Sequence, residues 1–471
     1  MKRSARVASP SPAKRAKGGI SASEYHPREP GRDSEEGIVW PAPPAAMQAA
    51  RDFIVRCTAA KRKTLIVPDK DADGLSAGVI IHRTLTDGLG LDASLVDVHL
   101  ASKGSSVHDE TERDAMRAKQ AAFVIVVDQG SRPGPPLVPD AEVLVIDHHL
   151  SDGFPEGATV VSACECPPVA TASLLTFEIC EALAERVAEE CGYICAIGTH
   201  GDLGTALKWQ PPFPDMTSTF KRHSRKAINE AVALVNAPRR TAAFDVISAW
   251  SALISSSAPR DILTNRRLRE ARAEIGVEVE RHTHTSPKFS KDGKVAVLRI
   301  SSAAQVHPVI ATRWAGHLKS GALEIVMVAN EGYLPGMVNF SCRVAKCARN
   351  RDPPVNIIDS LRDIAGRSTT DLASRMGEDF ARGHKEASGG IVPTEEFDEM
   401  MQLMQVGVKP DRPREARAKG GPKEAAQKNN LMRYFGKPTP AGKAHSSGKA
   451  ARVPTECSGL LSVLLKGPTP A

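Results

Sequence analysis

The chain has 471 residues and a formal net charge of +7, which is enough length for two or three domains, each with its own hydrophobic core. No apolar run reaches the ~18–20 residues of a membrane span, and we expect no signal-peptide core near the first residues. Nine cysteines without the CxxC spacing of zinc sites predict free thiols in a reducing compartment, and 4% aromatic residues argue against an extended stacking platform for nucleic-acid bases.

Residues 1–45 predict a basic tail outside the folded domains. Residues 1–20 hold six Lys or Arg and no acidic residue, so the tail would attract phosphates without sequence preference. A solvated, disordered segment is the alternative interpretation. Lys2-Arg3 and Lys14-Arg15-Ala16-Lys17, ten residues apart, resemble a bipartite nuclear localisation signal. We therefore expect a nuclear protein, with the cytoplasm as the alternative.

Three short, apolar, β-branched runs predict parallel strands covered on both faces: residues 64–68, 123–127 and 143–146. The first ends in the acidic turn 69–74, whose glycine lets a helix begin at Leu75. The second ends at Asp128, and the third ends at the triplet Asp147-His148-His149. Because the carboxyl ends of parallel strands share one crevice, we expect these side chains to lie close together.

A fourth contribution is expected after the apolar, helix-like stretch 193–198. Asp202 lies there among glycines that permit a close approach to the other acids. Carboxylates and imidazoles bind Mg²⁺ or Mn²⁺, and a carboxylate that bridges two ions ~3.5–4 Å apart serves phosphoryl chemistry. Each Asp could instead simply cap a helix. Unpaired buried charge is costly, however, so the whole set favours a two-metal site.

These motifs resemble those of the DHH phosphoesterase family, and within it those of the RecJ-like single-strand exonucleases. The resemblance implies that Asp71 holds one ion, that Asp73 holds the other, and that Asp128 bridges both. It further implies that His148 and Asp202 complete the coordination of the second ion. One departure is Val67, which stands where the oligonucleotide and cyclic-dinucleotide members carry a histidine. The resemblance also gives Asp69 to the first ion and places His149 close to the scissile phosphate.

The rest of the fold is expected to be a second, smaller domain and its connector. The expected class is α/β, with a parallel-sheet DHH domain at 46–210, a helical connector at 211–290 and a mixed DHH-associated C-terminal domain at 291–405. Residues 304–318 predict a helix whose isolated histidines we assign no role. Residues 406–471 predict a second basic tail, with thirteen Lys or Arg and four acids between 409 and 471.

Two segments of the second domain predict contacts with substrate phosphates. Residues 338–343 read as a strand with Ser341 and Arg343 on one face, which matches the family's substrate-facing strand, although Arg343 could equally be an ordinary surface residue. The family's glycine-rich motif G-G-G-H-x-x-A-A-G resembles residues 381–389, where Gly383, His384, Ala387 and Gly389 match and Ala381, Arg382 and Ser388 do not. Glycines there would let backbone N–H groups approach an anion.

The C-terminal tail contains one apolar cluster, in residues 428–437. Leu431, Tyr434 and Phe435 resemble the PIP box that docks on the sliding clamp PCNA, with Lys428 in place of its glutamine. Such a plug would fold on contact with its partner. An ordinary short hydrophobic patch is the alternative.

The sequence therefore predicts an enzyme: a Mn²⁺- or Mg²⁺-dependent, two-ion phosphodiesterase that hydrolyses single-stranded DNA or RNA, acting as a RecJ-like exonuclease in DNA repair or replication. One alternative is a member of the same superfamily that acts on short oligoribonucleotides, cyclic dinucleotides or polyphosphate, since fold and metal site do not set the substrate. The other is a non-catalytic replication or repair scaffold.

Overall fold

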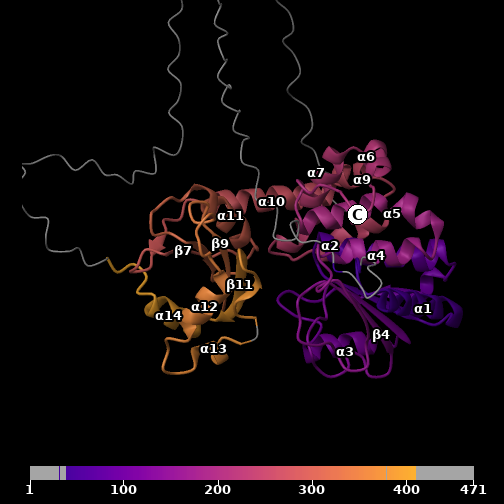
Figure 1. The fold of residues 1–471 in the computed structure, drawn as a ribbon, viewed down its shortest axis with the longest axis horizontal. Helices are drawn as coiled ribbons and strands as arrows, with labels where there is room; N and C mark the ends of the chain where they lie inside the picture. The colour runs from indigo at the N-terminus through magenta and orange to yellow at the C-terminus, as the bar shows by residue number, and fades with distance from the viewer. Residues whose placement is uncertain (1–30, 32–38, 378, 410–471) are drawn as a thin grey trace, which may run out of the picture. The chain divides into compact units, whose positions relative to one another are not determined.

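The computed structural model describes residues 31, 39–377 and 379–409 (Figure 1). The expected nuclear signal and the PIP-like motif lie outside the described residues. Among the described helices, none is both long and apolar enough to cross a membrane. The eight cysteines in the described part are free thiols, in line with the sequence.

The first sheet consists of five parallel strands in the order β2-β1-β3-β4-β5, which confirms the α/β class. The three runs identified in the sequence form its centre. The strands are β1 (Thr64–Pro68), β2 (Val96–Val98), β3 (Phe123–Val127), β4 (Glu142–Asp147) and β5 (Thr159–Ser162).

Strand side chains alternate between two hydrophobic cores, as the period of two in a β-strand requires. Ile66, Ile125 and Ile146 join the core under α1 (Pro44–Ala60), α2 (Ala72–Arg83), α4 (Ala172–Glu181) and α5 (Glu185–Asp202). Their neighbours Leu65, Val124 and Val145 join the smaller core on the other face, which contains Met116 of α3 (Glu110–Ala118). Both faces of the sheet are therefore covered by hydrophobic side chains, and the polar groups of the site lie at the strand ends.

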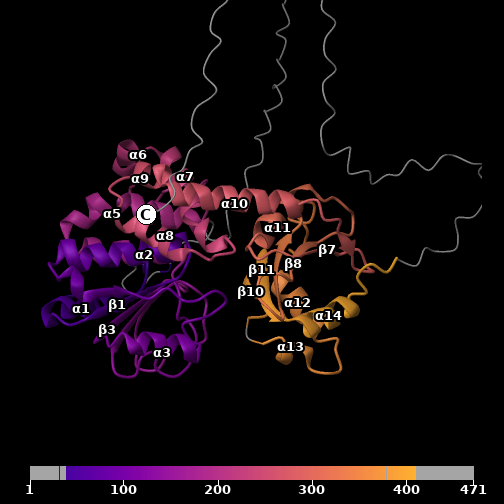
Figure 2. The same ribbon diagram turned by 180° about the vertical axis from the view of Figure 1, so that it is seen from behind.

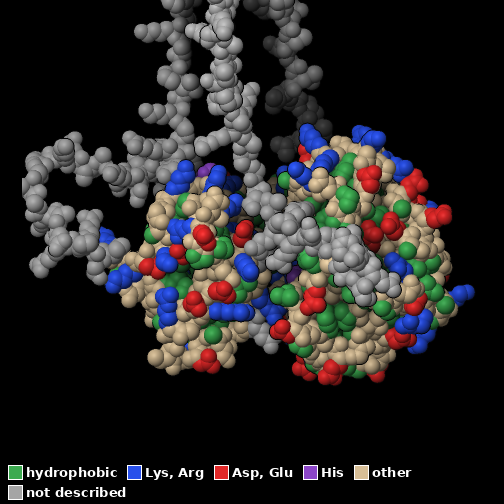
Figure 3. Space-filling view, viewed as in Figure 1, with side chains coloured by type: hydrophobic (Ala, Val, Ile, Leu, Met, Phe, Trp, Pro, Cys, Tyr) green, Lys and Arg blue, Asp and Glu red, His purple; other side chains and the backbone are tan. Residues whose placement is uncertain are grey.

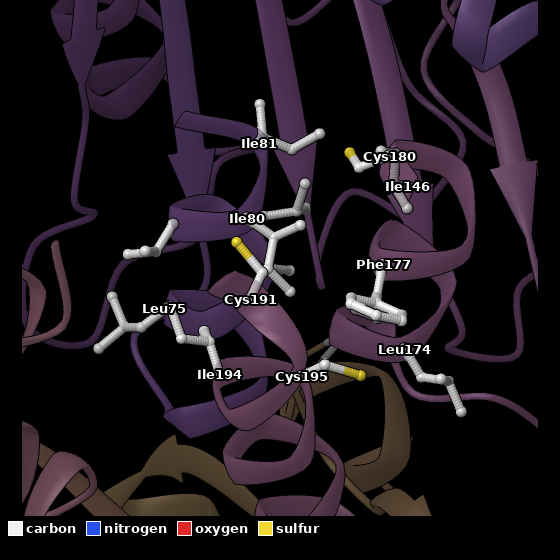
Figure 4. Packing of buried hydrophobic residues seen from close by; sticks show 14 of the residues in the cluster. Leu75, Ile80, Ile81, Ile146, Leu174, Phe177, Cys180, Cys191, Ile194 and Cys195 are labelled. Atoms are coloured by element: carbon white, nitrogen blue, oxygen red, sulfur yellow. The ribbon is translucent and has the colours of Figure 1, made fainter. Parts of the chain in front are cut away.

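The larger core fixes α2, α4 and α5 against one another and against the sheet. Figure 4 shows Leu75, Ile80 and Ile81 of α2 beside Ile194 and Cys191 of α5, with Leu174 and Phe177 of α4 close by. Every one of these side chains is buried. Burial of a large aliphatic side chain contributes about 1.5–3 kcal/mol, so this core holds the three helix ends that carry polar site residues in fixed positions.

A helical connector follows, as the charged sequence predicted (Figure 2). Several of its helices begin at side-chain caps: Asp245 accepts from the backbone N–H of Ser248, and Asn265 accepts from that of Leu268. The elements are α6 (Thr217–His223), α7 (Arg225–Val235), the short η3 (Pro238–Arg240), α8 (Val246–Ile254), α9 (Pro259–Thr264) and α10 (Arg266–His282).

The second sheet is mixed, in the order β10-β11-β9-β8-β7-β6, with only β7 and β8 parallel. It packs with its helices around a separate hydrophobic core. Its elements are β6 (Lys288–Phe289), β7 (Val295–Ile300), α11 (His307–His317), β8 (Ile325–Asn330), β9 (Met337–Val344), α12 (Ile357–Ala365), α13 (Leu372–Arg375), β10 (Arg382–His384), β11 (Ala387–Pro393) and α14 (Thr394–Leu403).

Two helix boundaries differ from the sequence prediction. Helix α2 begins at Ala72 rather than Leu75, because the Asp71 side chain caps it by accepting from the N–H groups of Asp73 and Gly74. Helix α5 continues through its glycines and ends at Asp202. A Cβ atom at Gly198 would lie 2.4 Å from Ser173 Oγ, so this glycine serves close helix packing rather than a turn.

Candidate functional site

The acidic residues gather where the order of the first sheet reverses. Strand β1 is flanked by β2 on one side and β3 on the other, and such switch points form the ligand crevice of open parallel sheets. Asp69 follows β1, Asp128 follows β3, and Asp147 ends β4. The three strands adjoin, so the sheet itself brings these residues together.

The β1–α2 turn presents Asp69 and Asp71 toward the crevice. Gly74 makes the turn possible, because a Cβ atom there would lie 2.7 Å from the backbone N and O of Asp69. Arg239 of η3 lies 3.6 Å from Asp71 Oδ2. Burial alone would raise the pKa of Asp71, but Arg239 and the capped amides outweigh it and lower the pKa. Asp71 is therefore an anion in the folded protein.

Asp73 is fully buried and faces the first turn of α4. Its Oδ2 accepts from the N–H of Ala172 at 2.7 Å, and its Oδ1 accepts from the N–H of Ser173 at 3.0 Å and from the Ser173 hydroxyl. Burial raises its pKa to about 6, although these donors act against the shift. A carboxylate held in this way anchors α4, because the helix N-terminus favours negative charge.

Asp128 occupies a special backbone position between the strands. Its φ of 62° lies in the left-handed region, which few non-glycine residues adopt, although Asn, Asp and His do so more often than others. Its Oδ1 is buried, accepts no hydrogen bond within the described chain, and lies 3.2 Å from His148 Nε2. Burial, together with the charges of Asp73 and Asp71, raises its pKa well above the ordinary value.

Asp147 holds the following two histidines in place. Its Oδ1 accepts from the backbone N–H of His148 at 2.7 Å and contacts His149 Nδ1 at 2.8 Å, and its Oδ2 accepts from the N–H of Ser131 at 3.1 Å. Burial opposes ionisation, yet the hydrogen bond from His149 brings the pKa of Asp147 to about 2. The partnership raises the pKa of His149 to about 9 against the effect of burial, so this half-exposed side chain is a cation.

Asp202, the last residue of α5, completes the cluster. His148 Nε2 lies 3.4 Å from Asp202 Oδ2 and 3.8 Å from Asp73 Oδ2. Burial raises the pKa of Asp202 well above its ordinary value, and the neighbouring charges of Asp73 and Asp71 add to the shift. A carboxylate at a helix C-terminus also faces the negative end of the helix dipole.

The cluster fits divalent cations on the chemistry of its donors. Desolvated carboxylates that repel one another are stabilised by a bound cation, and oxygen with imidazole ligands suits Mn²⁺ or Mg²⁺. Three sets have ligand atoms within 4.8 Å of one another: Asp69, Asp71 and Asp128; Asp128, His148 and His149; and Asp73, His148 and Asp202. Asp128 and His148 each belong to two sets, so every carboxylate and imidazole that the sequence proposed as a ligand lies in one continuous cluster.

The second domain contains the predicted strand, but one of the glycines expected to approach an anion serves strand pairing instead. Arg343 lies in β9 and donates to the hydroxyl of Ser341 and to the carbonyl of Cys342, each at 2.8 Å. A Cβ atom at Gly389 would lie 2.3 Å from the Phe340 carbonyl, so Gly389 allows β11 to pair closely with β9. Gly383 has a φ of 105° in β10, next to His384, whose side chain lies outside the described part.

Two arginines and one buried histidine near Arg343 were missed in the sequence. His307, at the start of α11, is 4% exposed, and its Nδ1 has no hydrogen-bond partner in the described chain. Burial, together with the charges of Arg343 and Arg240, lowers its pKa to about 3, so the three residues are electrostatic neighbours. Burial and the charge of Arg239 lower the pKa of Arg240 to about 9. Adjacent arginines in the sequence Pro238-Arg239-Arg240 were the available indication.

Comparison with known proteins identifies the first domain. The profile of the DHH family, N-terminal domain, matches residues 63–199. No curated protein sequence matches the chain. Among solved structures, RecJ from Thermus thermophilus in complex with Mn²⁺ aligns at a TM-score of 0.54 and 18% identity, over 78% of this chain and 55% of that one. This chain therefore spans just over half the length of the Thermus protein.

Two further structures support the same fold. Exonuclease RecJ bound to manganese aligns at a TM-score of 0.52 and 19% identity, over 78% of this chain and 95% of that one. The DHH domain of a member of a family of ribosomal proteins aligns at 0.54 and 13% identity, over 77% and 90%. Identities this low establish the fold rather than the substrate. The chain thus has a RecJ-like fold, and its residues 63–199 match the model of the DHH family, N-terminal domain.

Proposed function

We propose that this protein is a metal-dependent phosphodiesterase that hydrolyses single-stranded nucleic acid as a RecJ-like exonuclease. The observation that carries the proposal is the convergence of five carboxylates with the imidazoles of His148 and His149 at the switch point of the sheet. The pKa values of Asp128 and Asp202 are raised because burial and the neighbouring carboxylates disfavour their ionised forms. A bound cation would remove this penalty. Strongly perturbed groups in a crevice are typical of catalytic sites.

The three ligand sets support two cation positions. Asp69, Asp71 and Asp128 would hold one ion, and Asp73, His148 and Asp202 would hold the other. Asp128, whose Oδ1 lies 3.2 Å from His148 Nε2, would stand between them. Bound there, the ions supply an activated water and neutralise charge on a phosphoryl group. His149, kept cationic by Asp147, is placed to stabilise negative charge on phosphoryl oxygens.

Asp73 has two roles in this proposal. It belongs to the ligand set of the second ion, and its Oδ2 lies 3.8 Å from His148 Nε2. Both of its oxygens also accept hydrogen bonds from the start of α4, so Asp73 anchors α4 against α2. A carboxylate oxygen that accepts one hydrogen bond keeps a lone pair for a cation.

Three largely buried arginines support the proposal that the substrate is a polyanion. Arg239, Arg240 and Arg343 keep a cationic environment that an approaching phosphate would neutralise. On the face in Figure 3, by contrast, Lys and Arg side chains are interspersed with Asp and Glu over the described surface. We therefore propose that phosphates are held by these few enclosed guanidinium groups rather than by a broad basic surface.

A substrate panel tests the proposal. The purified full chain would be incubated with Mn²⁺ and end-labelled single-stranded DNA, single-stranded RNA, dinucleotides or polyphosphate, with Asp128→Asn as the inactive control. Stepwise shortening of a long single strand, absent in the control, is the expected result. Cleavage of dinucleotides or polyphosphate alone would move the substrate to the other branch of the superfamily, and no cleavage of any substrate would favour a scaffold.

Nuclear localisation and PCNA binding are proposals that rest on the terminal segments of the sequence alone. Replacing Leu431, Tyr434 and Phe435 together by alanine should abolish co-precipitation with PCNA if the PIP-like motif is used. Replacing Lys14, Arg15 and Lys17 should redistribute a fluorescent fusion from the nucleus to the cytoplasm. An unchanged result in either experiment removes the corresponding proposal without affecting the metal centre.

A further inference from the structure

Asp202 is the one acid of the cluster that lies at the end of a helix rather than after a strand, so its position depends on how the end of α5 is held. Helix α5 is fixed from the inside by two glycines. A Cβ atom at Gly201 would lie 3.0 Å from the Ala72 Cβ, and one at Gly198 would lie 2.4 Å from Ser173 Oγ. The end of the helix is therefore packed tightly against the starts of α2 and α4.

His200 holds the same turn from another side. Residues two apart on a helix lie on nearly opposite faces, so His200 and Asp202 project in different directions. His200 is 1% exposed and uses both ring nitrogens: Nδ1 lies 2.8 Å from Asn229 Oδ1 on α7, and Nε2 accepts from Trp209 Nε1 at 2.9 Å. Its ring also stacks on Phe220 of α6, with centroids 5.9 Å apart and planes at 10°.

The two hydrogen bonds define one protonation state. The Asn229 oxygen can only accept, so Nδ1 must donate, and the Trp209 indole can only donate, so Nε2 must accept. His200 is thus a neutral imidazole with a single tautomer, which gives its ring a fixed orientation. Three segments after α5 converge on this ring: the loop with Trp209, helix α6 and helix α7.

We propose that His200 is a positioning residue that holds Asp202 in the metal cluster by clamping the last turn of α5 to the connector. His200 belongs to none of the three ligand sets and would act through Asp202. The proposal rests on the metal-dependent function proposed above and adds a dependence of metal affinity on the connector. Groups that orient metal ligands typically change metal affinity by about 10–100-fold when they are removed.

Calorimetric titration of the purified, metal-free full chain with Mn²⁺ tests the proposal. His200→Ala should weaken Mn²⁺ binding about tenfold, because it removes both hydrogen bonds and the ring. His200→Gln retains one donor and one acceptor and should stay within about threefold of the wild type. Trp209→Phe removes only the bond to Nε2 and should give an intermediate loss.

Ile228→Ala is the matched control, because Ile228 is buried on α7 next to Asn229 but belongs to the hydrophobic core. This variant should lower the melting temperature without changing Mn²⁺ affinity. Equal weakening of Mn²⁺ binding by Ile228→Ala and His200→Ala would overturn the proposal, since general destabilisation would then explain both. Wild-type affinity in a folded His200→Ala protein would overturn it directly, and if that variant does not fold, wild-type affinity in Trp209→Phe would do so.

The same titration separates this inference from the proposed function. A wild-type chain that binds no Mn²⁺ overturns the metal-dependent function and this inference with it. A wild-type chain that binds Mn²⁺ with an affinity insensitive to His200 overturns only the positioning role.

Discussion

The acidic cluster of the first domain and the arginines around Arg343 both bury groups of like charge, negative in the first region and positive in the second. In the cluster, burial and mutual repulsion raise the pKa of Asp128 and Asp202. Around Arg343, burial and like charge lower the pKa of Arg240 and His307. The charge of each region is only partly paired, by His149 with Asp147 and by Arg239 with Asp71, and stability alone would favour apolar residues at both places. The acidic cluster is therefore suited to binding a cation, and the group around Arg343 is suited to binding an anion.

The largest expected effect comes from removing the shared carboxylate of the acidic region. Asp128→Asn should reduce hydrolysis by at least about 10³-fold, because it takes away a ligand common to two ligand sets. The measurement is the initial rate on end-labelled single strands at saturating Mn²⁺.

The same variant also tests whether the acidic region is strained. The substitution would remove one charge from a group of like charges, so the metal-free variant should melt at the same temperature as the wild type or higher. A clear fall in melting temperature would show that Asp128 has a structural role, and the comparison of the two regions would then fail.

The cationic region should respond in substrate binding rather than in metal binding. Arg343→Ala should lower kcat/KM about 10–100-fold, since a hydrogen bond to a charged group contributes about 1.5–3 kcal/mol. Arg343→Lys should recover part of the loss, because lysine keeps the charge without the fork of donors. Mn²⁺ affinity should be unchanged in both, and an Mn²⁺ affinity that falls with kcat/KM would contradict the division into two regions.

Each region also contains a buried neutral histidine that should make folding sensitive to acid. The folded-state pKa is about 4 for His200 and about 3 for His307, against about 6.5 in an unfolded chain. Between these values the unfolded state takes up protons that the folded state does not. The stabilisation is therefore complete above pH 6.5 and decreases as the pH falls toward 4, by up to roughly 1.4 kcal/mol per pH unit for each histidine.

Urea unfolding at pH 7.5, 6 and 5 measures this effect. The raised pKa values of Asp128 and Asp202 act in the opposite direction, so the histidine contribution is the difference between the wild type and His200→Gln or His307→Gln. Each variant should lose less free energy of unfolding between pH 6.5 and 5 than the wild type does. Parallel pH profiles would contradict the assignment of neutral, buried imidazoles.

The smallest effect tests the anchoring role of Asp73. Ser173→Ala removes one of its three hydrogen bonds and should lower the free energy of unfolding by about 1–2 kcal/mol. Ser255→Ala is the control, because the Ser255 hydroxyl only bonds to its own helix at the surface. Equal stability of the two variants would show that Asp73 does not depend on α4.

Strand ends were the most predictable part of the molecule. Uniformly apolar runs predicted β1, β3 and β4, and the polar residues that follow them could only lie at the sheet edge. That is why Asp71 and Asp128 could be placed at one edge of the sheet from the strand pattern, whereas the assignment of Asp69 to an ion came from the family resemblance. The helical connector was also expected, although exact helix starts depended on side-chain caps, as Asp71 shows for α2.

The remaining features depend on contacts between distant segments, which no local pattern records. The hydrogen bonds from α4 to Asp73 join residues about one hundred positions apart in the chain. His307 was left without a role because an isolated histidine on a helix is ambiguous until its burial is known. Gly389 matched a motif typical of anion binding, whereas its contact with the Phe340 carbonyl shows a requirement of strand pairing.

The most direct test of the account is the number of Mn²⁺ ions bound by the metal-free chain in calorimetric titration, with Asp128→Asn measured beside the wild type. Two proposed cation positions predict two ions per wild-type chain and a loss of at least one in the folded variant. A wild-type chain that binds no Mn²⁺, or a variant that binds the same number with the same affinity, would contradict it.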